Sequence, residues 1–421
     1  MFIPRVLALL FLMAVQAHAA TEADYAACNA SLPDKRIAAC TRIIEDTNEE
    51  ARNRGYAHYG RALGYLRKGD NDRAISDFDA TIRIMPSYTP AFVNRGSAFL
   101  NKRDYDRAFA DFNQALTIDP ESVLALYHRG YAYSQTGKYD RAIEDYSAAI
   151  RVDPSRSYLY SWRGNAHRYQ GDLERALADY NESIRRDPNY SPAYAGRGAV
   201  RLLQNDPEAA LSDLNQAVRL QPNDPFAFSQ RGDIYRSMER YDQAVADYSE
   251  AIRLLPGRYF FHNSRAAAYE SQRDFEHAIA DYGEAIRLNA DSPDAYANRA
   301  RIYVDRKDHD HAIPDLTQLI RLAPSYFAYG DRGAAYLAKS QFDLAIADYS
   351  EAIRLYPTYG GHHQSRALAY LAKGDKDHAI ADFKQAIELD PLGSKTSRDE
   401  LKTLVGEAGV PARKNMLEML K

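Results

Sequence analysis

The sequence predicts an all-α fold, a solenoid built from about ten stacked helical hairpins. Three observations predict it, and the first is a strict period. Proline recurs every 34 residues at Pro86, Pro120, Pro154, Pro188, Pro222 and Pro256. After a one-residue deletion the series resumes at Pro357 and closes at Pro391. A fixed period of this size indicates stacked copies of one small unit.

The second observation is that each period contains two helices. In the copy Ala91–Pro120, apolar residues recur at helical spacing in two runs, which the polar segment Lys102–Asp104 separates. Two helices joined by a short polar turn form a helical hairpin. The closing proline ends the second helix and begins the next copy.

The third observation is that small and large residues hold fixed places in the period. The first helix of each copy carries Gly or Ala at one site, and the second helix carries alanine at the counterpart site in every copy. These alanines are Ala74, Ala108, Ala142, Ala176, Ala210, Ala244, Ala278, Ala312, Ala345 and Ala379. A larger residue would force the helices apart, at a cost of about 1–3 kcal/mol. Large residues such as Phe112 and Tyr248 fill the seam to the next copy, so each copy buries its apolar face only by stacking.

With these positions assigned, the repeat resembles the tetratricopeptide repeat family. Repeats of that family have about 34 residues, with an aromatic, a small residue and a tyrosine in the first helix, and Ala, an aromatic, Ala and proline in the second. The sixth copy supplies this set as Phe228, Gly232, Tyr235, Ala244, Tyr248, Ala251 and Pro256. Copies fit the pattern from about Gly55 to Pro391. The resemblance implies a right-handed α-solenoid whose first helices line a concave groove for peptides or extended segments of partner proteins.

Carried over position by position, this groove would present side chains from five first helices. The candidate partner-binding residues are Tyr127, His128, Tyr131, Gln135, Trp162, Asn165, Arg168, Gln230, Asp233, Arg236, Asn263, Glu270, Asn298 and Arg301. Trp162 is the only tryptophan and would make an anchor, because aromatic side chains and arginine are enriched at binding hot spots. The alternative is that Trp162 packs against an adjacent first helix.

Some copies depart from the family pattern. His167 and Arg201 stand where tyrosine is usual, Ala290 replaces a closing proline, and Leu319 takes the place of a small residue. These departures are local and leave the family resemblance intact.

Two charged positions recur in every copy and are not explained by the apolar core. Arginine precedes the small residue at Arg61, Arg95, Arg129, Arg163, Arg197, Arg231, Arg265, Arg299, Arg332 and Arg366. Aspartate precedes the seam residue at Asp77, Asp111, Asp145, Asp179, Asp213, Asp247, Asp281, Asp315, Asp348 and Asp382. We expect a ladder of ion pairs, either within a copy or between neighbouring copies. The alternative is repeated surface charge, worth about 0–1 kcal/mol per pair.

The first residues differ from the repeats and predict an exported protein. Arg5 is followed by the apolar run Val6–Val15, and Ala17 and Ala19 are small residues at cleavage positions. This pattern is typical of a secretory signal peptide, residues 1–19, with the mature chain beginning at Ala20. The apolar run is too short to span a bilayer, which needs about 20 residues. We therefore expect a periplasmic or secreted protein without membrane insertion.

The remaining segments are caps at the two ends of the array. Cys28 and Cys40 are the only cysteines, and in an oxidising compartment we expect them to form a disulfide within a divergent N-terminal helical cap, residues 20–51. The alternative is two buried free thiols. The repeat solenoid would occupy residues 52–391. In residues 392–421, Ser397–Glu400 reads as a capping box that opens a C-terminal capping helix, followed by a tail.

The composition and motifs favour a non-enzymatic scaffold for protein–protein interaction. A net charge of −4 gives no basic footprint for nucleic acid. Neither a phosphate-binding loop nor a nucleophile stands outside the repeat pattern. The pairs His309/His311 and His362/His363 lack the further ligands that a closed metal site needs, so we expect neither metal nor cofactor. The alternative function is binding of glycan or peptidoglycan, with tyrosines and Trp162 stacking on sugar rings.

Overall fold

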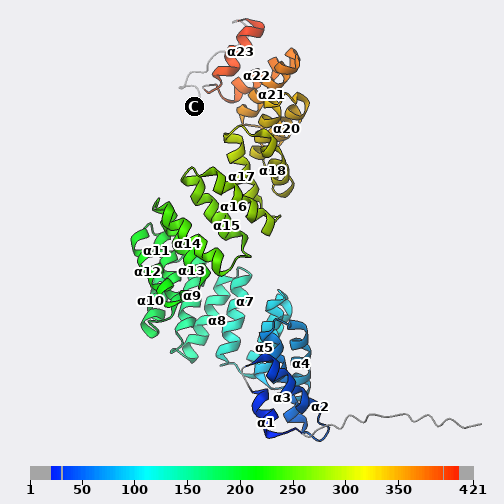
Figure 1. Ribbon diagram of the computed structural model, residues 1–421, viewed down its shortest axis with the longest axis vertical. Helices are drawn as coiled ribbons and strands as arrows, with labels where there is room; N and C mark the ends of the chain where they lie inside the picture. Colours follow the sequence, from blue (N-terminus) through cyan, green and yellow to red (C-terminus); the bar gives the residue numbers. More distant parts are fainter. Residues whose placement is uncertain (1–19, 30–31, 392, 407–421) are drawn as a thin grey trace, which may run out of the picture. The chain divides into compact units, whose positions relative to one another are not determined.

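The computed structural model describes residues 20–29, 32–391 and 393–406. The expected signal peptide and most of the C-terminal tail lie outside these residues. Within them the chain forms 23 α-helices and no strand, which confirms the all-α solenoid of hairpins. The chain divides into two compact units, Met1–Leu220 (unit 1) and Gln221–Lys421 (unit 2). Figure 1 shows the antiparallel helix pairs of each unit.

Unit 1 contains a short cap and five hairpins. Its helices are α1 (Glu22–Cys28), α2 (Pro33–Glu45), α3 (Ala51–Arg67), α4 (Asn71–Ile84), α5 (Thr89–Asn101), α6 (Tyr105–Ile118), α7 (Val123–Gln135), α8 (Tyr139–Val152), α9 (Ser157–Tyr169), α10 (Leu173–Arg186), α11 (Ser191–Leu203) and α12 (Pro207–Leu220). From α3 on, odd-numbered helices are the first helices of the hairpins and even-numbered helices are the second.

Unit 2 contains five hairpins and a final helix. Its helices are α13 (Pro225–Ser237), α14 (Tyr241–Leu254), α15 (Tyr259–Ser271), α16 (Phe275–Leu288), α17 (Pro293–Asp305), α18 (His309–Leu322), α19 (Tyr326–Ala338), α20 (Phe342–Leu355), α21 (Gly360–Lys373), α22 (Lys376–Leu389) and α23 (Lys395–Val405).

The turn inside each hairpin shows why the sequence stops and restarts the helix there. The Asp104 side chain accepts a hydrogen bond from the Arg107 N–H and so caps the N-terminus of α6. The turn needs one left-handed residue, which is Gly69 (φ 75°) in one hairpin and Arg103 (φ 58°) in the next. Glycine adopts this conformation without strain, whereas other L-residues pay about 1–2 kcal/mol.

The close approach of the two helices explains the small-residue site. Ala108 and the Phe112 ring are fully buried beside Gly96. A Cβ atom added to Gly96 would lie 2.6 Å from Phe112 Cε1, closer than two carbons can pack. The small residue therefore makes room for the seam ring of its own hairpin.

The Arg–Asp ion pairs of the ladder form within each hairpin, and an arginine such as Arg163 also bonds to the preceding hairpin. The Arg163 Nε and Nη2 atoms donate to Asp179 at 2.9 and 2.7 Å, within one hairpin. Its Nη1 donates to Ser147 Oγ at 3.1 Å, in the second helix of the preceding hairpin. The bidentate pair recurs in all ten hairpins. Since the aspartates are buried, loss of one would leave an unpaired arginine charge inside the stack.

Histidines add a further donor to some of these aspartates. His262 Nδ1 lies 3.3 Å from Asp281 Oδ1, and His58 and His363 hold the same place in their hairpins. Burial raises the pKa of the Asp281 carboxyl, but hydrogen bonds from Arg265 and His262 outweigh it and keep that pKa below its usual value. His363, one of the histidines considered as a metal ligand, likewise has Asp382 as its hydrogen-bond partner.

Two departures from the family pattern are used in the same ladder. Arg201 Nη1 lies 2.8 Å from Asp213 Oδ2 and gives that aspartate a second arginine. His167 is buried with its Nε2 3.9 Å from Asp179 Oδ2, and burial lowers the pKa of its imidazole. Both side chains thus replace the tyrosine with a polar contact to the ladder.

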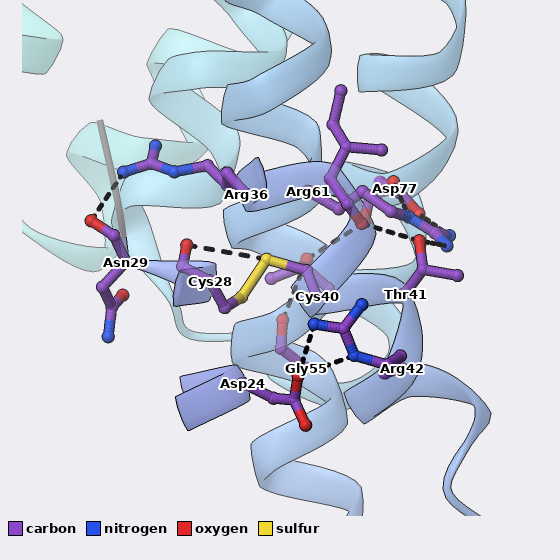
Figure 2. The surroundings of a disulfide bond; sticks show 12 residues. Asp24, Cys28, Asn29, Arg36, Cys40, Thr41, Arg42, Gly55, Arg61 and Asp77 are labelled. Carbon is purple, nitrogen blue, oxygen red and sulfur yellow. Dashed lines mark hydrogen bonds and ion pairs between the residues drawn. A yellow bond between two sulfur atoms is a disulfide. The ribbon is translucent and has the colours of Figure 1, made fainter. Parts of the chain in front are cut away.

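The N-terminal cap is held by covalent and ionic links. Figure 2 shows the disulfide that joins Cys28 of α1 to Cys40 of α2. A Cβ atom added to Gly60 of α3 would lie 3.0 Å from both sulfur atoms, so the disulfide packs directly on the first hairpin. Arg42 pairs with Asp24 at 2.5 Å across α1 and α2.

The predicted C-terminal capping box is wrong, although the helix exists. The helix α23 begins at Lys395, so Ser397 lies inside its first turn rather than at its N-cap. The buried Ser397 hydroxyl instead donates to Gln364 Oε1 at 2.9 Å, across to α21. Leu401 packs with Phe383 and covers the end of the last hairpin. The serine was misread because its tertiary partner is not visible in a local motif.

Candidate partner-binding face

We call the surface formed by the first helices of the hairpins the first-helix face. In unit 1 a pocket of about 370 Å³ lies on it, between the C-terminal ends of α7 and α9 and the start of α8. The pocket is lined by Ser134, Gln135, Tyr139, Trp162, Asn165, Ala166 and Tyr169. The structure therefore brings together three residues chosen from the sequence, Gln135, Trp162 and Asn165. The lining contains no acidic or basic residue.

Trp162, which lines this pocket, also belongs to an aromatic cluster on the first-helix face. The Trp162 ring meets the Tyr131 ring edge-on at a centroid distance of 5.3 Å and the Tyr127 ring at 6.0 Å. Tyr127 also contacts Tyr158 at 5.4 Å. Trp162 thus packs against an adjacent first helix, as the alternative held, and still lines the pocket. The two readings of Trp162 are compatible.

His128 lies behind this cluster in a packed position. Its ring is stacked on Phe112 at a centroid distance of 6.0 Å, and Ser97 Oγ lies 3.4 Å from its Nδ1. Burial lowers the pKa of His128 to about 4, so the ring is neutral at physiological pH. This geometry gives His128 a role in packing.

Asn165 and Arg168 hold their positions through neighbours on the same face. The Tyr180 hydroxyl donates to Asn165 Oδ1 at 2.9 Å, so the amide nitrogen is the group that remains for a ligand. The Arg168 guanidinium lies 4.3 Å above the centre of the Tyr169 ring. This contact holds Tyr169, which is 61% exposed, at the rim of the pocket.

In unit 2 the corresponding residues form a polar network. The Tyr248 hydroxyl donates to Asp233 Oδ1 at 2.7 Å, and the Arg236 guanidinium lies close enough to interact with both groups. Burial raises the pKa of Asp233. Hydrogen bonds within the protein therefore already occupy the carboxylate that the sequence assigned to a partner.

The next two first helices of unit 2 continue the network. Glu270 accepts a hydrogen bond from the Tyr282 hydroxyl at 3.0 Å and pairs with Arg301 at 2.5 Å. Since Glu270 is on α15 and Arg301 is on α17, the pair links neighbouring hairpins. Both charges are neutralised by each other.

The remaining candidates of unit 2 are dispersed. Gln230 is exposed, whereas Asn263 Oδ1 is buried and lacks a hydrogen-bond partner among the described residues. Asn298 and Arg301 line a second pocket of about 460 Å³, whose floor includes Leu319, the large residue at a small-residue site. The departure at Leu319 therefore shapes a cavity rather than the helix contact alone.

A single rule explains several residues that vary from copy to copy. Where the seam residue is tyrosine, its hydroxyl reaches the first-helix face and needs a partner there, as Asn165, Asp233 and Glu270 show. Where the seam residue is Phe78, the neighbouring positions are the apolar Leu63 and Leu66. Burying a hydroxyl without a partner costs about 1–3 kcal/mol, which accounts for the correlation.

Tyr146 is the exception to this rule. Its hydroxyl is buried beside the Ser134 side chain but makes no well-formed hydrogen bond among the described residues. The neighbouring position on the face is Tyr131, whose ring packs on Trp162. At this position the chain keeps an aromatic side chain on the first-helix face, although a polar side chain there could form a hydrogen bond with the buried Tyr146 hydroxyl.

The sequence reasoning missed four pocket residues, Ser134, Tyr139, Ala166 and Tyr169, of which the two tyrosines contribute aromatic rings. Their rings are stacked at a centroid distance of 5.5 Å with an angle of 12° between planes. Tyr169 could have been found, because at the equivalent site six residues after the ladder arginine the other copies carry no aromatic residue. Tyr139 could not, since Tyr105 and Tyr241 stand at the same site elsewhere.

The histidine pairs have neighbours of their own. His311 Nδ1 lies 2.8 Å from Asp308 and its ring stacks on Tyr303, while His362 lies between Tyr326 and Tyr359. Within the described residues we find no group of three potential metal ligands. Over the same residues, all helices are too short or too polar to cross a bilayer.

Stacked hairpins that present a first-helix face in each unit define a helical-repeat protein. The tetratricopeptide repeat family matches residues 59–123, 93–157, 127–191, 163–225 and 263–327, and further repeat forms of it match 225–257, 326–359 and 363–392. The chain belongs to the tetratricopeptide repeat family. The repeats support a scaffold for protein–protein interaction. A comparison with curated proteins gave no match.

Solved structures share this fold. An IFIT1 structure with Gppp-AAAA is 14% identical, covers 85% of this chain and 87% of its own, and has a TM-score of 0.54. A thermophilic TPR protein from Thermus thermophilus is 26% identical over 43% of this chain and 99% of its own, with a TM-score of 0.40. YrrB, described as a TPR protein with an unusual peptide-binding site, is 21% identical over 45% and 97%, with a TM-score of 0.35.

Proposed function

We propose that the protein binds an extended segment of a partner protein on the first-helix face of unit 1, with one apolar side chain of that segment in the pocket beside Trp162. The observation that carries the proposal is the pocket of about 370 Å³ into which Gln135, Trp162 and Asn165 converge. Concave sites with aromatic walls and a few placed polar groups are typical ligand sites.

The chemistry of the pocket suits a peptide. Rings of Tyr139, Trp162 and Tyr169 offer apolar area at low entropic cost, and aromatic anchors dominate many interfaces. The carboxamides of Gln135 and Asn165 match the donor and acceptor groups of a peptide backbone. Because the lining is uncharged, an apolar or proline side chain is favoured over an ionised one.

The proposed place of action is outside the cytoplasm, in a periplasm or after secretion. Support comes from the signal-peptide pattern of residues 1–19 and from the disulfide between Cys28 and Cys40. Disulfides persist in oxidising compartments and are rare in the cytosol.

A differential capture experiment tests the binding site. Purified protein, Trp162→Ala and Gln135→Ala are incubated with the envelope fraction, and Leu124→Ala is the control because Leu124 is 57% exposed at the opposite end of α7. We expect a set of proteins retained by the parent and by Leu124→Ala, and weakened about 30-fold or more by Trp162→Ala, as for a hot spot worth about 2 kcal/mol. Circular dichroism checks that each variant is folded.

The outcomes separate the two ligand classes expected from the sequence. Equal capture by all variants would contradict the proposed site. Cell-wall glycan strands are offered in parallel, and binding of glycan that Trp162→Ala abolishes, without protein capture, would replace the peptide by a sugar as the ligand.

A further inference from the structure

The first described residue of the chain is anchored to the N-terminal cap. The Ala20 backbone nitrogen lies 2.8 Å from Asp46 Oδ2, across 26 residues of sequence. The other carboxylate oxygen, Asp46 Oδ1, accepts a hydrogen bond from the Asn48 N–H at 2.9 Å. Asp46 is the C-cap of α2 and only 6% exposed.

The charge of Asp46 has no ionic partner of its own. None of the lysine, arginine or histidine side chains that the structure describes forms an ion pair with it, and Arg54 acts on it only at longer range. An ionised carboxylate this buried is costly unless a cation or several donors compensate it. Two backbone N–H groups supply part of that compensation.

We propose that the mature chain begins at Ala20 and that its new α-ammonium group forms a partly buried ion pair with Asp46. The cut is hydrolysis of the Ala19–Ala20 peptide bond by a leader peptidase of the export machinery, in which water supplies the carboxylate oxygen of Ala19 and the two protons that turn the Ala20 amide nitrogen into an ammonium group. Cleavage turns an amide donor into an ammonium with up to three donors at the same place. The inference rests on the proposed export, but the ion pair is tested independently of it.

The surroundings of Ala20 are built for an N-terminus. Ala20 packs against the buried core around Cys28 and Cys40. The next residue, Thr21, is the N-cap of α1 and forms a reciprocal capping box with Asp24. Ala20 and Thr21 are therefore both held against the cap, and the acids Glu22 and Asp24 offset the positive end of the α1 dipole near the ammonium.

The test compares chains with defined N-termini. One form begins at Ala20, a second has the same start with the amine acetylated, and a third begins at Ala19, which moves the ammonium about 3.8 Å along the chain. Each form is also made with Asp46→Asn, and with Asp34→Asn as the matched control, because Asp34 is an exposed acid on α2. The measurement is hydrogen exchange of the α1 amides.

We expect acetylation to speed exchange in α1 about tenfold, as loss of an interaction worth about 1.4 kcal/mol would. The extended form should fall between the other two. Asp46→Asn should remove the difference among the three forms, and Asp34→Asn should preserve it. Equal exchange in all three forms of the parent chain, or an acetylation effect that survives Asp46→Asn, would overturn the ion pair.

The site of processing is read separately from the protein exported by the cell. N-terminal sequencing should give Ala20-Thr21-Glu22 as the first residues. A chain that is exported but begins elsewhere would overturn the proposed start while leaving export itself standing, and an uncut chain in the cytoplasm would contradict the export on which it rests.

Discussion

The first-helix faces of the two units differ, although the same repeat builds both. In unit 1, Tyr139, Trp162 and Tyr169 present rings around an uncharged pocket. In unit 2, Asp233, Glu270 and Arg301 are tied to seam tyrosines or to each other. The comparison teaches that a residue which varies from copy to copy is not by that fact a binding residue, because its partner can lie inside the repeat.

The ladder beneath both faces should be equally important in each unit. We expect Asp179→Ala in unit 1 and Asp281→Ala in unit 2 each to lower the free energy of unfolding by about 3–5 kcal/mol, since each leaves a partly buried arginine without its bidentate partner. Urea unfolding followed by circular dichroism measures the effect.

The control for this prediction is Glu174→Ala, in the first turn of the same helix as Asp179. It should cost no more than about 1 kcal/mol, through the helix dipole alone. An unchanged unfolding curve for Asp179→Ala would mean that the ladder is no more than surface charge.

The seam hydroxyls distinguish satisfied copies from the exceptional one. Tyr180→Phe and Tyr248→Phe should each cost about 0.5–1.5 kcal/mol, because each removes a hydrogen bond to the face. Tyr146→Phe should cost less than the other two, since the Ser134 side chain beside its buried hydroxyl makes no well-formed hydrogen bond with it. Thermal melts of the three variants check this order, and a Tyr146→Phe variant as unstable as the other two would point to a partner for that hydroxyl.

A pair of exchanges at one position makes each unit resemble the other. Asn165 in unit 1 and Asp233 in unit 2 both accept from a seam tyrosine. Because burial raises the pKa of Asp233, the folded state holds its proton more tightly than the unfolded chain. Stability from this group is therefore present below the unfolded pKa of about 3.9 and is lost as pH rises through the folded pKa.

We accordingly expect Asp233→Asn to gain stability over the parent between pH 3 and pH 7, by roughly 1 kcal/mol at most. Asn165→Asp should lose stability relative to the parent as pH rises over the same range. Unfolding free energies measured across this range test the exchange, and parallel pH profiles for parent and variant would show that Asp233 carries no such penalty.

The repeat frame could be predicted from the sequence because every copy repeats the same packing problem. The close approach of the two helices in a hairpin dictates small residues at Gly96 and Ala108 and a large ring at Phe112. Because these residue types recur with the period, the sequence reveals the approach. The ladder was visible in the sequence because every copy carries the same Arg and Asp. The partners of each arginine were not visible, because an arginine such as Arg163 bonds both to its own hairpin and to the preceding one.

The candidate site was predicted in part. Gln135, Trp162 and Asn165 were found because the family places them on the first helix. Tyr139 was missed because a pocket wall is a tertiary property that no single repeat position encodes. The internal roles of Asp233 and Glu270 were missed for the same reason, since their partners lie in the second helix of the hairpin.

The most direct test of the central claim is site-specific photo-crosslinking in cells. A photoreactive amino acid replaces Gln135, at the pocket of unit 1, or Gln230, on the first-helix face of unit 2; both side chains are exposed. We predict protein adducts from position 135 that disappear with Trp162→Ala, and few or none from position 230. Adducts that form from position 230 alone, or equally from both positions, would contradict the claim that the aromatic pocket of unit 1 is where the partner binds.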